Sequence, residues 1–341
     1  MTLADTFTKS DSGPMKIIFF SSKPYEKTAF QEFSGHHQIN YTPHHLNQDS
    51  AKLAQGYDAA CVFVSDQLDK DCLNELKKAS LKYILLRSAG FNHVDIKEAK
   101  RLGFRVARVP AYSPHAVAEH ALALLMSLNR KVHRAFNRVR EGNFNLDGLM
   151  GVDLHGKTVG IIGTGKIGEV FSKIMKGLGC EVLAYDKYNN KNCVALGVKY
   201  VTLNELYKNS DVISFHCPLN SETRHMLNTE SLSLCKKGVI IINTGRGALI
   251  DTPSLINALK SEHVGAVGLD VYEEEEDLFF EDHSNEIIQD ETFLRLLNFP
   301  NVLITGHQAF FTKEALANIA QTTLENANLF EKNLENPNEV N

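Results

Sequence analysis

Residues 163–168 have the glycine spacing of a phosphate-binding turn. Gly163, Gly165 and Gly168 close an apolar, β-branched run and open a stretch with helical periodicity. The first glycine permits a tight turn, the second lets a pyrophosphate approach the backbone, and the third allows the helix to pack closely on the strand. In this position between strand and helix, the glycines predict a dinucleotide-binding site.

The residues around the glycines indicate which dinucleotide binds. Lys166 and Ile167 open the helical stretch, where unpaired N–H groups and the positive end of the helix dipole meet phosphates. Asp186 ends the next strand-like run, where a carboxylate can accept hydrogen bonds from both ribose hydroxyls and repels a 2′-phosphate. The segment therefore favours NAD over NADP. The alternative, a glycine-rich turn in an unrelated α/β protein, does not explain the order of strand, glycines, helix and acid.

Two side chains suited to catalysis also end strand-like runs. Arg246 follows the run 239–244, and His307 follows the run 301–306. In open α/β sheets, ligands bind outside the carboxyl ends of the strands. A guanidinium can hold a carboxylate by paired hydrogen bonds and polarise a carbonyl, and an imidazole is a natural general acid. Taken singly, an arginine in a turn is more often a surface group, and most of the 14 histidines are expected at the surface or in packing.

Five segments in order resemble the D-isomer-specific 2-hydroxyacid dehydrogenase family. They are AYSPHAVAEHA (111–121), HCPLNSETRHML (216–227), NTGRGALID (243–251), GLDVYEEEEDLFF (268–280) and NVLITGHQAFFT (301–312). Together they span most of the chain. Within the family, EEEEDLFFEDHSNEIIQD and GHQAF are most similar to the bacterial fermentative, lactate-forming members. The resemblance implies reversible, NADH-dependent reduction of pyruvate to D-lactate.

The resemblance also implies catalytic roles. Arg246 would anchor the substrate, His307 would protonate the keto oxygen, and Glu275 would be the carboxylate partner that orients the imidazole and favours its charged form. Each such group typically contributes about a hundredfold or more in rate. The choice of Glu275 within the acidic run 273–277 rests on the family spacing alone, because acidic runs are usually solvated.

Further positions around cofactor and substrate carry over from the family. For the cofactor they are Cys217, Pro218 and Thr223 near the adenosine half, Thr244 and Gly245 at the nicotinamide ribose, and Asp270 on the nicotinamide side. For the substrate they are the N–H groups of Ala89 and Gly90, together with Tyr112, Arg246 and His307. Gly306 departs from the proline that much of the family has before the histidine, which leaves the loop freer and marks the lactate-forming subgroup.

Two other functions stay open. The first is another enzyme of the family, acting on glycerate, phosphoglycerate or a branched 2-keto acid; the first-domain loops lack the extra basic residues expected for a phosphoglycerate enzyme. A formate dehydrogenase is disfavoured, because that branch lacks the carboxylate partner. The second is an NAD-sensing corepressor built on the same fold, which can retain the Arg246, Glu275 and His307 set.

The elements that position these residues follow from an alternation of β-branched runs with helical stretches, which predicts parallel sheets covered by helices. The expected strands are 16–20, 59–64, 83–88 and 104–109 in a first series, and 158–163, 181–186, 198–201, 211–216, 239–244, 266–271 and 301–306 in a second. The fold class is thus α/β, with two Rossmann-like or flavodoxin-like parallel-sheet domains and a cleft between them.

The predicted domain boundaries follow from the two series. Residues 1–111 with 311–341 form the substrate-binding domain, and residues 112–310 form the NAD-binding domain. Closure of the first domain would exclude water from the site. The polar residues 1–14 are interpreted as a disordered extension, an alternative start or an expression remnant.

One long helix is expected between the two series. Ser113 and Pro114 have the pattern of an N-cap and first helical residue, and an apolar stripe of helical period then continues to about residue 139. A helix this apolar packs against a second domain or a partner subunit. We therefore expect self-association as a dimer or tetramer, with this helix at the interface.

Composition limits the compartment and the partners. The formal net charge of −5 argues against a nucleic-acid-binding role, and no apolar run is long enough to cross a bilayer. The N-terminus has no apolar core of a secretory signal. The six cysteines form no CxxC pair and no zinc spacing with histidine, so we expect reduced, buried thiols, no metal site and a cytoplasmic location. His120 is interpreted as a helix-packing residue, and the pairs His36-His37 and His44-His45 as loop or edge residues.

Overall fold

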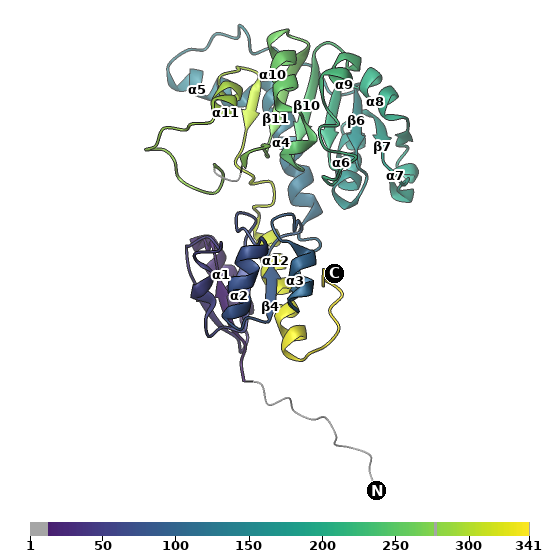
Figure 1. Ribbon diagram of the computed structural model, residues 1–341. Coiled ribbons are helices and arrows are strands. Elements are labelled where there is room, and N and C mark those ends of the chain that lie inside the picture. The colour runs from purple at the N-terminus through teal and green to yellow at the C-terminus, as the bar shows by residue number, and fades with distance from the viewer. Residues whose placement is uncertain (1–12, 276–277, 341) are drawn as a thin grey trace. The chain divides into compact units, whose positions relative to one another are not determined.

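The computed structural model describes residues 13–275 and 278–340, and these fall into two compact units (Figure 1). Unit 1 takes in the chain up to Ser113 and again from Thr312, and unit 2 is Pro114–Phe311. The predicted boundaries lie one or two residues from these crossings. The positions of the units relative to one another are not determined, so the predicted cleft stays a prediction. Most of the predicted disordered extension lies outside the described residues.

Unit 1 is built on a parallel sheet of five strands in the order β2-β1-β3-β4-β5. Its elements are β1 (Lys16–Phe19), α1 (Pro24–Phe33), β2 (Gln38–Tyr41), the 3₁₀ turn η1 (Ala51–Ala54), β3 (Ala59–Val62), α2 (Lys70–Lys78), β4 (Tyr83–Leu86), α3 (Ile96–Arg101), β5 (Arg105–Ala107) and α12 (Lys313–Glu331). This strand order is the flavodoxin-like one.

Both faces of the unit 1 sheet are covered. Strand residues such as Ile18 and Ile84 pack with α2 and α3 in one buried cluster. On the opposite face α12 packs against α1 and β4, and the rings of Phe19 and Phe30 meet edge to face at 4.7 Å. The last helix of the chain therefore completes the first sheet, as the discontinuous domain prediction requires.

Unit 2 is built on a parallel sheet of seven strands in the order β12-β11-β10-β9-β6-β7-β8. Its strands are β6 (Thr158–Ile162), β7 (Glu181–Tyr185), β8 (Lys199–Tyr200), β9 (Val212–Phe215), β10 (Val239–Asn243), β11 (Val264–Leu269) and β12 (Val302–Ile304). Its helices are α4 (Pro114–Arg130), α5 (Val132–Arg140), α6 (Lys166–Gly177), α7 (Lys191–Ala195), α8 (Leu203–Asn209), α9 (Thr229–Leu234), α10 (Thr252–Lys260) and α11 (Glu291–Leu297), with the 3₁₀ turn η2 (Gly247–Leu249).

Two separate apolar cores lie on the two faces of the unit 2 sheet. Helices α4 and α6 cover one face, where Ile242 is buried, and α8 to α11 cover the other, where its neighbour Ile241 is buried. Consecutive strand residues point to opposite faces, so a strand buried on both sides reads as a continuous apolar run. That is why β10 was visible in the sequence as VIIIN.

The two predicted parallel sheets are confirmed, and each predicted strand run overlaps a strand of the structure. Most runs are shorter at their ends, and β11 begins earlier than the predicted 266–271. The edge strand β2 was missed because QINY is polar and only partly covered. Edge strands of this kind carry little apolar signal.

The prediction of one long helix after Ser113 is wrong at its second half. The helix begins at Pro114 as expected, but Lys131 adopts a left-handed backbone with φ of 49° and separates α4 from α5. A left-handed residue cannot continue a right-handed helix. None of the residues of α5 is buried, whereas α4 lies under the sheet of unit 2.

The predicted state of the cysteines is confirmed: all six are free, and five of them are buried while Cys217 is half-buried. No helix among the described residues is long and apolar enough to cross a membrane.

A buried ion pair anchors the carboxyl end of β4 in unit 1. The side chains of Arg87 and Glu26 are 0% and 4% exposed, and Nε of the arginine donates to Oε1 at 2.6 Å. Arg87 also donates to the carbonyls of Phe20, Ser21 and Cys61, at the ends of strands β1 and β3. One guanidinium thus ties three strand ends together.

Replacing Glu26 by Ala should destabilise the protein by about 3–5 kcal/mol, because it leaves a buried guanidinium without its counter-charge. Urea unfolding followed by circular dichroism measures the change. The matched control is Glu75→Ala, which breaks the exposed pair with Lys78 and should cost no more than about 1 kcal/mol. Equal, small losses in both variants would contradict the anchoring role of Glu26.

Candidate active site

Three residues of the predicted site follow three neighbouring parallel strands of unit 2. Arg246 follows β10, Asp270 follows β11, and His307 follows β12. Since the carboxyl ends of parallel strands meet at one edge of a sheet, these residues share that edge. The glycine turn 163–168 follows β6 at the same edge, where the strand order reverses between β6 and β9.

His307 and Glu275 form a direct pair. Nδ1 of the imidazole lies 2.7 Å from Oε1 of the carboxylate, and both side chains are 19% exposed. A carboxylate only accepts hydrogen bonds, so Nδ1 carries the proton, and the tautomer is fixed with Nε2 as the other nitrogen. Nε2 has no hydrogen-bonding partner among the described residues, which leaves it for a ligand.

The acidic run offers one carboxylate to His307 for a structural reason. Glu273 is engaged by His225 at 2.6 Å and by Arg224 at 3.0 Å, and Glu274 is exposed. Glu275 turns inward, and its Oε2 also accepts the backbone N–H of Tyr272 at 2.8 Å. The structure therefore identifies Glu275 as the partner of His307, whereas the spacing of residues in the sequence could not distinguish it from the neighbouring glutamates. Glu276 and Asp277 lie outside the described residues.

Asp270 fixes the loop that carries His307. Its buried carboxylate accepts the Thr305 hydroxyl at 2.6 Å and the backbone N–H groups of Gln308 and Ala309 at 2.9 and 2.8 Å. The N–H of His307 donates to the carbonyl of Asp270 at 2.8 Å. His307 has a positive φ of 52°, a conformation that costs about 1–2 kcal/mol. Three hydrogen bonds to a carboxylate, each worth about 1.5–3 kcal/mol, outweigh that cost.

The contacts of Asp270 bear on its predicted cofactor role. Both of its carboxylate oxygens are engaged by the 305–309 loop, so in this structure the side chain organises that loop. Its place on the nicotinamide side stays a prediction.

Arg246 sits in a turn that packs against the segment leading to Glu275. Asn243 holds this turn by accepting the N–H of Gly245 at 3.0 Å and donating to the carbonyl of Arg246 at 2.8 Å. A Cβ atom on Gly247 would lie only 2.1 Å from the carbonyl carbon of Tyr272. Only glycine allows this approach. The half-buried guanidinium donates to the Gly245 carbonyl at 2.7 Å, and its other N–H groups remain for a ligand.

The geometry at the three glycines of the turn suits the roles that their spacing predicts. Gly163 has φ of 93°, and a Cβ there would lie 2.5 Å from the backbone nitrogen of Cys217. A Cβ on Gly168 would lie 2.0 Å from the carbonyl oxygen of Gly163, so this glycine permits close helix–strand packing. Gly165 faces open space and is the N-cap of α6, whose first residues are Lys166 and Ile167. The unencumbered Gly165 backbone is the one that a phosphate can approach.

Asp186 ends β7 beside the glycine turn. Its Oδ2 accepts the backbone N–H of Thr164 at 2.5 Å and the Thr164 hydroxyl at 3.1 Å. The carboxylate is therefore anchored next to the turn and half-buried, in the position expected for a ribose-binding acid.

The segment after β9 lies against the same turn. Burial lowers the pKa of His216 to about 3 and raises the pKa of the Cys217 thiol to about 12, so both are neutral at pH 7. Pro218 is exposed, and its carbonyl accepts the hydroxyl of Thr223 at 2.7 Å. This neutral surface suits the adenosine half of a dinucleotide, which is the predicted role of Cys217, Pro218 and Thr223.

One buried polar atom near Arg246 lacks a partner. The hydroxyl of Thr244 is buried and makes no hydrogen bond among the described residues. Such groups are rare in folded proteins, because an unpaired buried hydroxyl is costly. Together with the open face at Gly165, this free hydroxyl fits a bound dinucleotide along the carboxyl edge of the sheet. The place of Thr244 and Gly245 at its nicotinamide end stays a prediction.

The predicted substrate-binding residues of unit 1 lie in the loop after β4 and next to the boundary with unit 2. The carbonyls of Ala89 and Gly90 accept Arg108 Nη1 and the Ser88 hydroxyl, each at 2.8 Å. Their N–H groups have no acceptor among the described residues, which suits a carboxylate ligand. The carbonyl of Tyr112 accepts the side-chain amide of Asn318 at 2.6 Å.

The interpretation of His120 as a helix-packing residue leaves out the hydrogen bonds that its ring makes. Its Nε2 lies 3.0 Å from the Thr305 hydroxyl and 3.3 Å from Oδ1 of Asp270. Because the Thr305 proton goes to Asp270, His120 is the donor in this chain of contacts. Sequence reasoning missed His120 and Thr305; the signal was a polar ring within the apolar stripe of α4.

Comparison with known proteins bears on the whole chain. Residues 122–309 match the family model of the D-isomer specific 2-hydroxyacid dehydrogenase NAD binding domain. The D-lactate dehydrogenase of Escherichia coli strain K12 is 51% identical over 328 residues, which are 96% of this chain and 100% of that protein.

Solved structures agree over the same length. A structure described as the pyruvate reductase of Chlamydomonas reinhardtii has a TM-score of 0.91 at 44% identity, covering 96% of this chain and 99% of that one. A D-lactate dehydrogenase with NAD⁺ from Lactobacillus jensenii has a TM-score of 0.80 at 30% identity, covering 96% and 100%. The cofactor of unit 2 is NAD. The chain belongs to the D-isomer specific 2-hydroxyacid dehydrogenase family.

Proposed function

We propose that this protein is an NAD-dependent D-lactate dehydrogenase that reduces pyruvate to D-lactate in a reversible reaction. The observation that carries the proposal is the 2.7 Å hydrogen bond between His307 and Glu275, at the sheet edge that also holds Arg246 and the glycine turn. The identity of 51% to a D-lactate dehydrogenase over nearly the whole chain supports the choice of substrate.

The proposed reaction assigns one task to each side chain. Arg246 holds the pyruvate carboxylate by paired hydrogen bonds and polarises the keto group. His307 donates the proton on Nε2 to the keto oxygen, and Glu275 stabilises the imidazolium before transfer and keeps the ring oriented. NADH, when bound, supplies the hydride for the keto carbon. The products are NAD⁺ and the 2-hydroxy acid, and the solvent reprotonates His307.

Proposed binding positions complete the site. The N–H groups of Ala89 and Gly90, which have no acceptor among the described residues, are proposed to donate to the substrate carboxylate, and Tyr112 is proposed as a further hydrogen-bonding residue for the substrate. Unit 1 is thus proposed as the substrate-binding domain and unit 2 as the NAD-binding domain. A cytoplasmic location is proposed from the six reduced thiols.

The substrate is tested with a panel of 2-keto acids and both reduced nicotinamide cofactors. We expect pyruvate with NADH to give the highest kcat/KM and D-lactate as the chiral product. NADPH should be used poorly, because Asp186 repels a 2′-phosphate. Loss of absorbance at the NADH band and chiral chromatography measure the two results.

Other outcomes of this panel identify the alternatives. Preference for glyoxylate, hydroxypyruvate or a branched 2-keto acid would replace the substrate while keeping the family chemistry. NADH binding with no turnover of any 2-keto acid would replace the enzyme by a nicotinamide-sensing binding protein.

Replacing His307 by Asn should lower kcat for pyruvate by at least about a hundredfold, because the amide cannot donate a proton as an acid. NADH binding should be nearly unchanged, since the glycine turn and Asp186 belong to other strands of the sheet. Steady-state kinetics and a fluorescence titration with NADH give the two readouts. Undiminished turnover would remove His307 from the mechanism.

We also propose that the protein self-associates, as a dimer or tetramer, through α5 and the segment after it. Large apolar side chains are exposed there: Val132, Phe136, Val139, Phe144, Leu146, Met150 and Val152. A concentration of large exposed apolar side chains in one segment is typical of protein–protein interfaces. Val132, Phe136 and Val139 belong to the second half of the helix predicted at the interface, whereas the buried residues of its first half, α4, face the unit 2 core.

Replacing Phe136 and Phe144 together by Ser should shift the protein toward monomer in sedimentation velocity, because the patch loses its largest apolar groups. Tyr188→Ser, which changes an exposed aromatic residue elsewhere in unit 2, serves as the control and should sediment like the unaltered protein. An unaltered protein that is monomeric at micromolar concentration would rule the interface out.

A further inference from the structure

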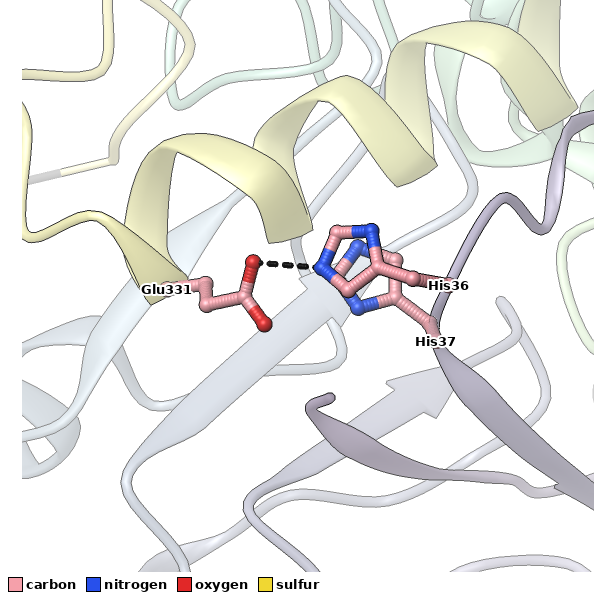
Figure 2. A group of neighbouring side chains, drawn as sticks. All are labelled: His36, His37 and Glu331. Carbon is pink, nitrogen blue, oxygen red and sulfur yellow. Dashed lines mark hydrogen bonds and ion pairs between the residues drawn. The ribbon is translucent and has the colours of Figure 1, made fainter. Parts of the chain in front are cut away.

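A cluster of two histidines and a carboxylate lies in unit 1 (Figure 2). His36 and His37 stand in the turn between α1 and β2, and Glu331 is the last residue of α12. One potential ligand atom from each residue lies within 4.8 Å of the other two. Within the described part of the chain it is the one such group of three or more metal-binding side chains. The proposed reaction gives none of these residues a role.

The contacts within the cluster bring nitrogen and oxygen donors together. Nε2 of His36 lies 2.7 Å from Oε2 of Glu331, and the two imidazole centroids are 4.3 Å apart. Figure 2 shows the two rings overlapping on one side of the carboxylate. His36 is exposed, while the Glu331 side chain is only 9% exposed, so the carboxylate is held in place and the His36 ring is free to adjust.

His37 supplies a second and independent observation. The residue is only 8% exposed, and its Nε2 lies 3.0 Å from the side-chain oxygen of Asn328. An amide oxygen accepts hydrogen bonds, so Nε2 carries the proton and Nδ1 presents a bare lone pair. Nδ1 is buried and has no hydrogen-bonding partner. A neutral imidazole whose outer nitrogen donates to a carbonyl oxygen is the form that binds metals in proteins.

The electrostatics favour the same form of the ring. Burial lowers the pKa of His37, and the neighbouring His36 lowers it further, while Glu331 and the hydrogen bond to Asn328 oppose the shift. A metal at Glu331 would replace the hydrogen bond that His36 makes with this carboxylate.

We propose that His36, His37 and Glu331 form a site for a divalent transition-metal ion of the Zn²⁺ type, completed by water. Two imidazole nitrogens and one carboxylate are a donor set that Zn²⁺ accepts with an open fourth position. Ligand distances of about 2.0–2.2 Å require the donors to draw closer than 4.8 Å, and the exposed His36 ring can make that movement. Spacing along the chain does not reveal the site, because Glu331 lies 295 residues after His36.

A bound ion would join two distant parts of unit 1. It would link the end of α12 to the turn before the edge strand β2. A ligand that binds only the folded chain stabilises it by mass action, so unit 1 should melt at a higher temperature with the metal. The expected effect is on stability, since the three residues are outside the proposed catalytic set.

The test uses the full chain, freed of metal by a chelator and then titrated with Zn²⁺ in a calorimeter and with Co²⁺ in a spectrophotometer. We expect one ion per chain, a raised melting temperature, and a visible Co²⁺ spectrum without the intense ultraviolet bands of thiolate ligation. His36→Gln should weaken Zn²⁺ binding by at least about tenfold. Asn328→Ala, which removes the hydrogen-bonding partner of a ligand, should weaken it by about 10–100-fold.

The matched control is His44→Gln, an exposed histidine of the second His-His pair, which should bind Zn²⁺ like the unaltered protein. Equal affinities in the His36 and His44 variants, thiolate bands in the Co²⁺ spectrum, or no uptake of Zn²⁺ at micromolar concentration would overturn the proposal. The readouts are independent of pyruvate reduction, so a negative result leaves the proposed function untouched.

Discussion

The buried carboxylate of Asp270 is the constraint on which the candidate active site depends. It lies at the end of the central strand among the three that carry the catalytic residues, and both of its oxygens are used to hold the loop after β12. That loop holds His307 in a left-handed backbone conformation. Without the hydrogen bonds to Asp270, the residue would relax to a less strained conformation. A proline at position 306 is not needed to hold the loop before His307, because hydrogen bonds from Thr305, Gln308 and Ala309 to Asp270 already hold it. The departure from the proline of much of the family therefore has a structural compensation.

Much of the site could be predicted because its residues are constrained by the backbone. At positions 163 and 168 the backbone comes so close to its neighbours that any Cβ would clash. The turn therefore requires glycine at both positions, and this requirement is visible in the sequence. Arg246 and His307 could be placed because each ends an apolar run, and parallel strands end together. The pairing of Glu275 with His307 came from resemblance, and the structure supplies the physical reason: Glu273 is already held by Arg224 and His225.

What could not be predicted depends on contacts between residues far apart in the chain or on single backbone angles. His120 resembles any residue of an apolar helix until Thr305, in another element, is seen at 3.0 Å. Lys131 interrupts a helical pattern of apolar residues that continues on both sides of it. Lysine has no intrinsic preference for a left-handed backbone, so its residue type does not predict the interruption. The edge strand β2 has half its surface in solvent, so it lacks the apolar run by which the other strands were found.

The C-terminal segment explains why unit 1 is discontinuous in sequence yet compact. At one edge of its sheet, Glu339 pairs with Arg105 of β5 at 2.7 Å, and the N–H of Val340 donates to the carbonyl of Val106. At the other edge, Glu331 contacts His36 in the turn before β2. The segment thus holds both edge strands of a five-stranded sheet whose central strands are already buried. Edge strands are the least stable parts of a sheet, because half of their backbone groups are unpaired. A metal at His36, His37 and Glu331 would reinforce the β2 edge, which these two histidines join to α12 by hydrogen bonds to Glu331 and Asn328. The β5 edge already has a guanidinium–carboxylate pair.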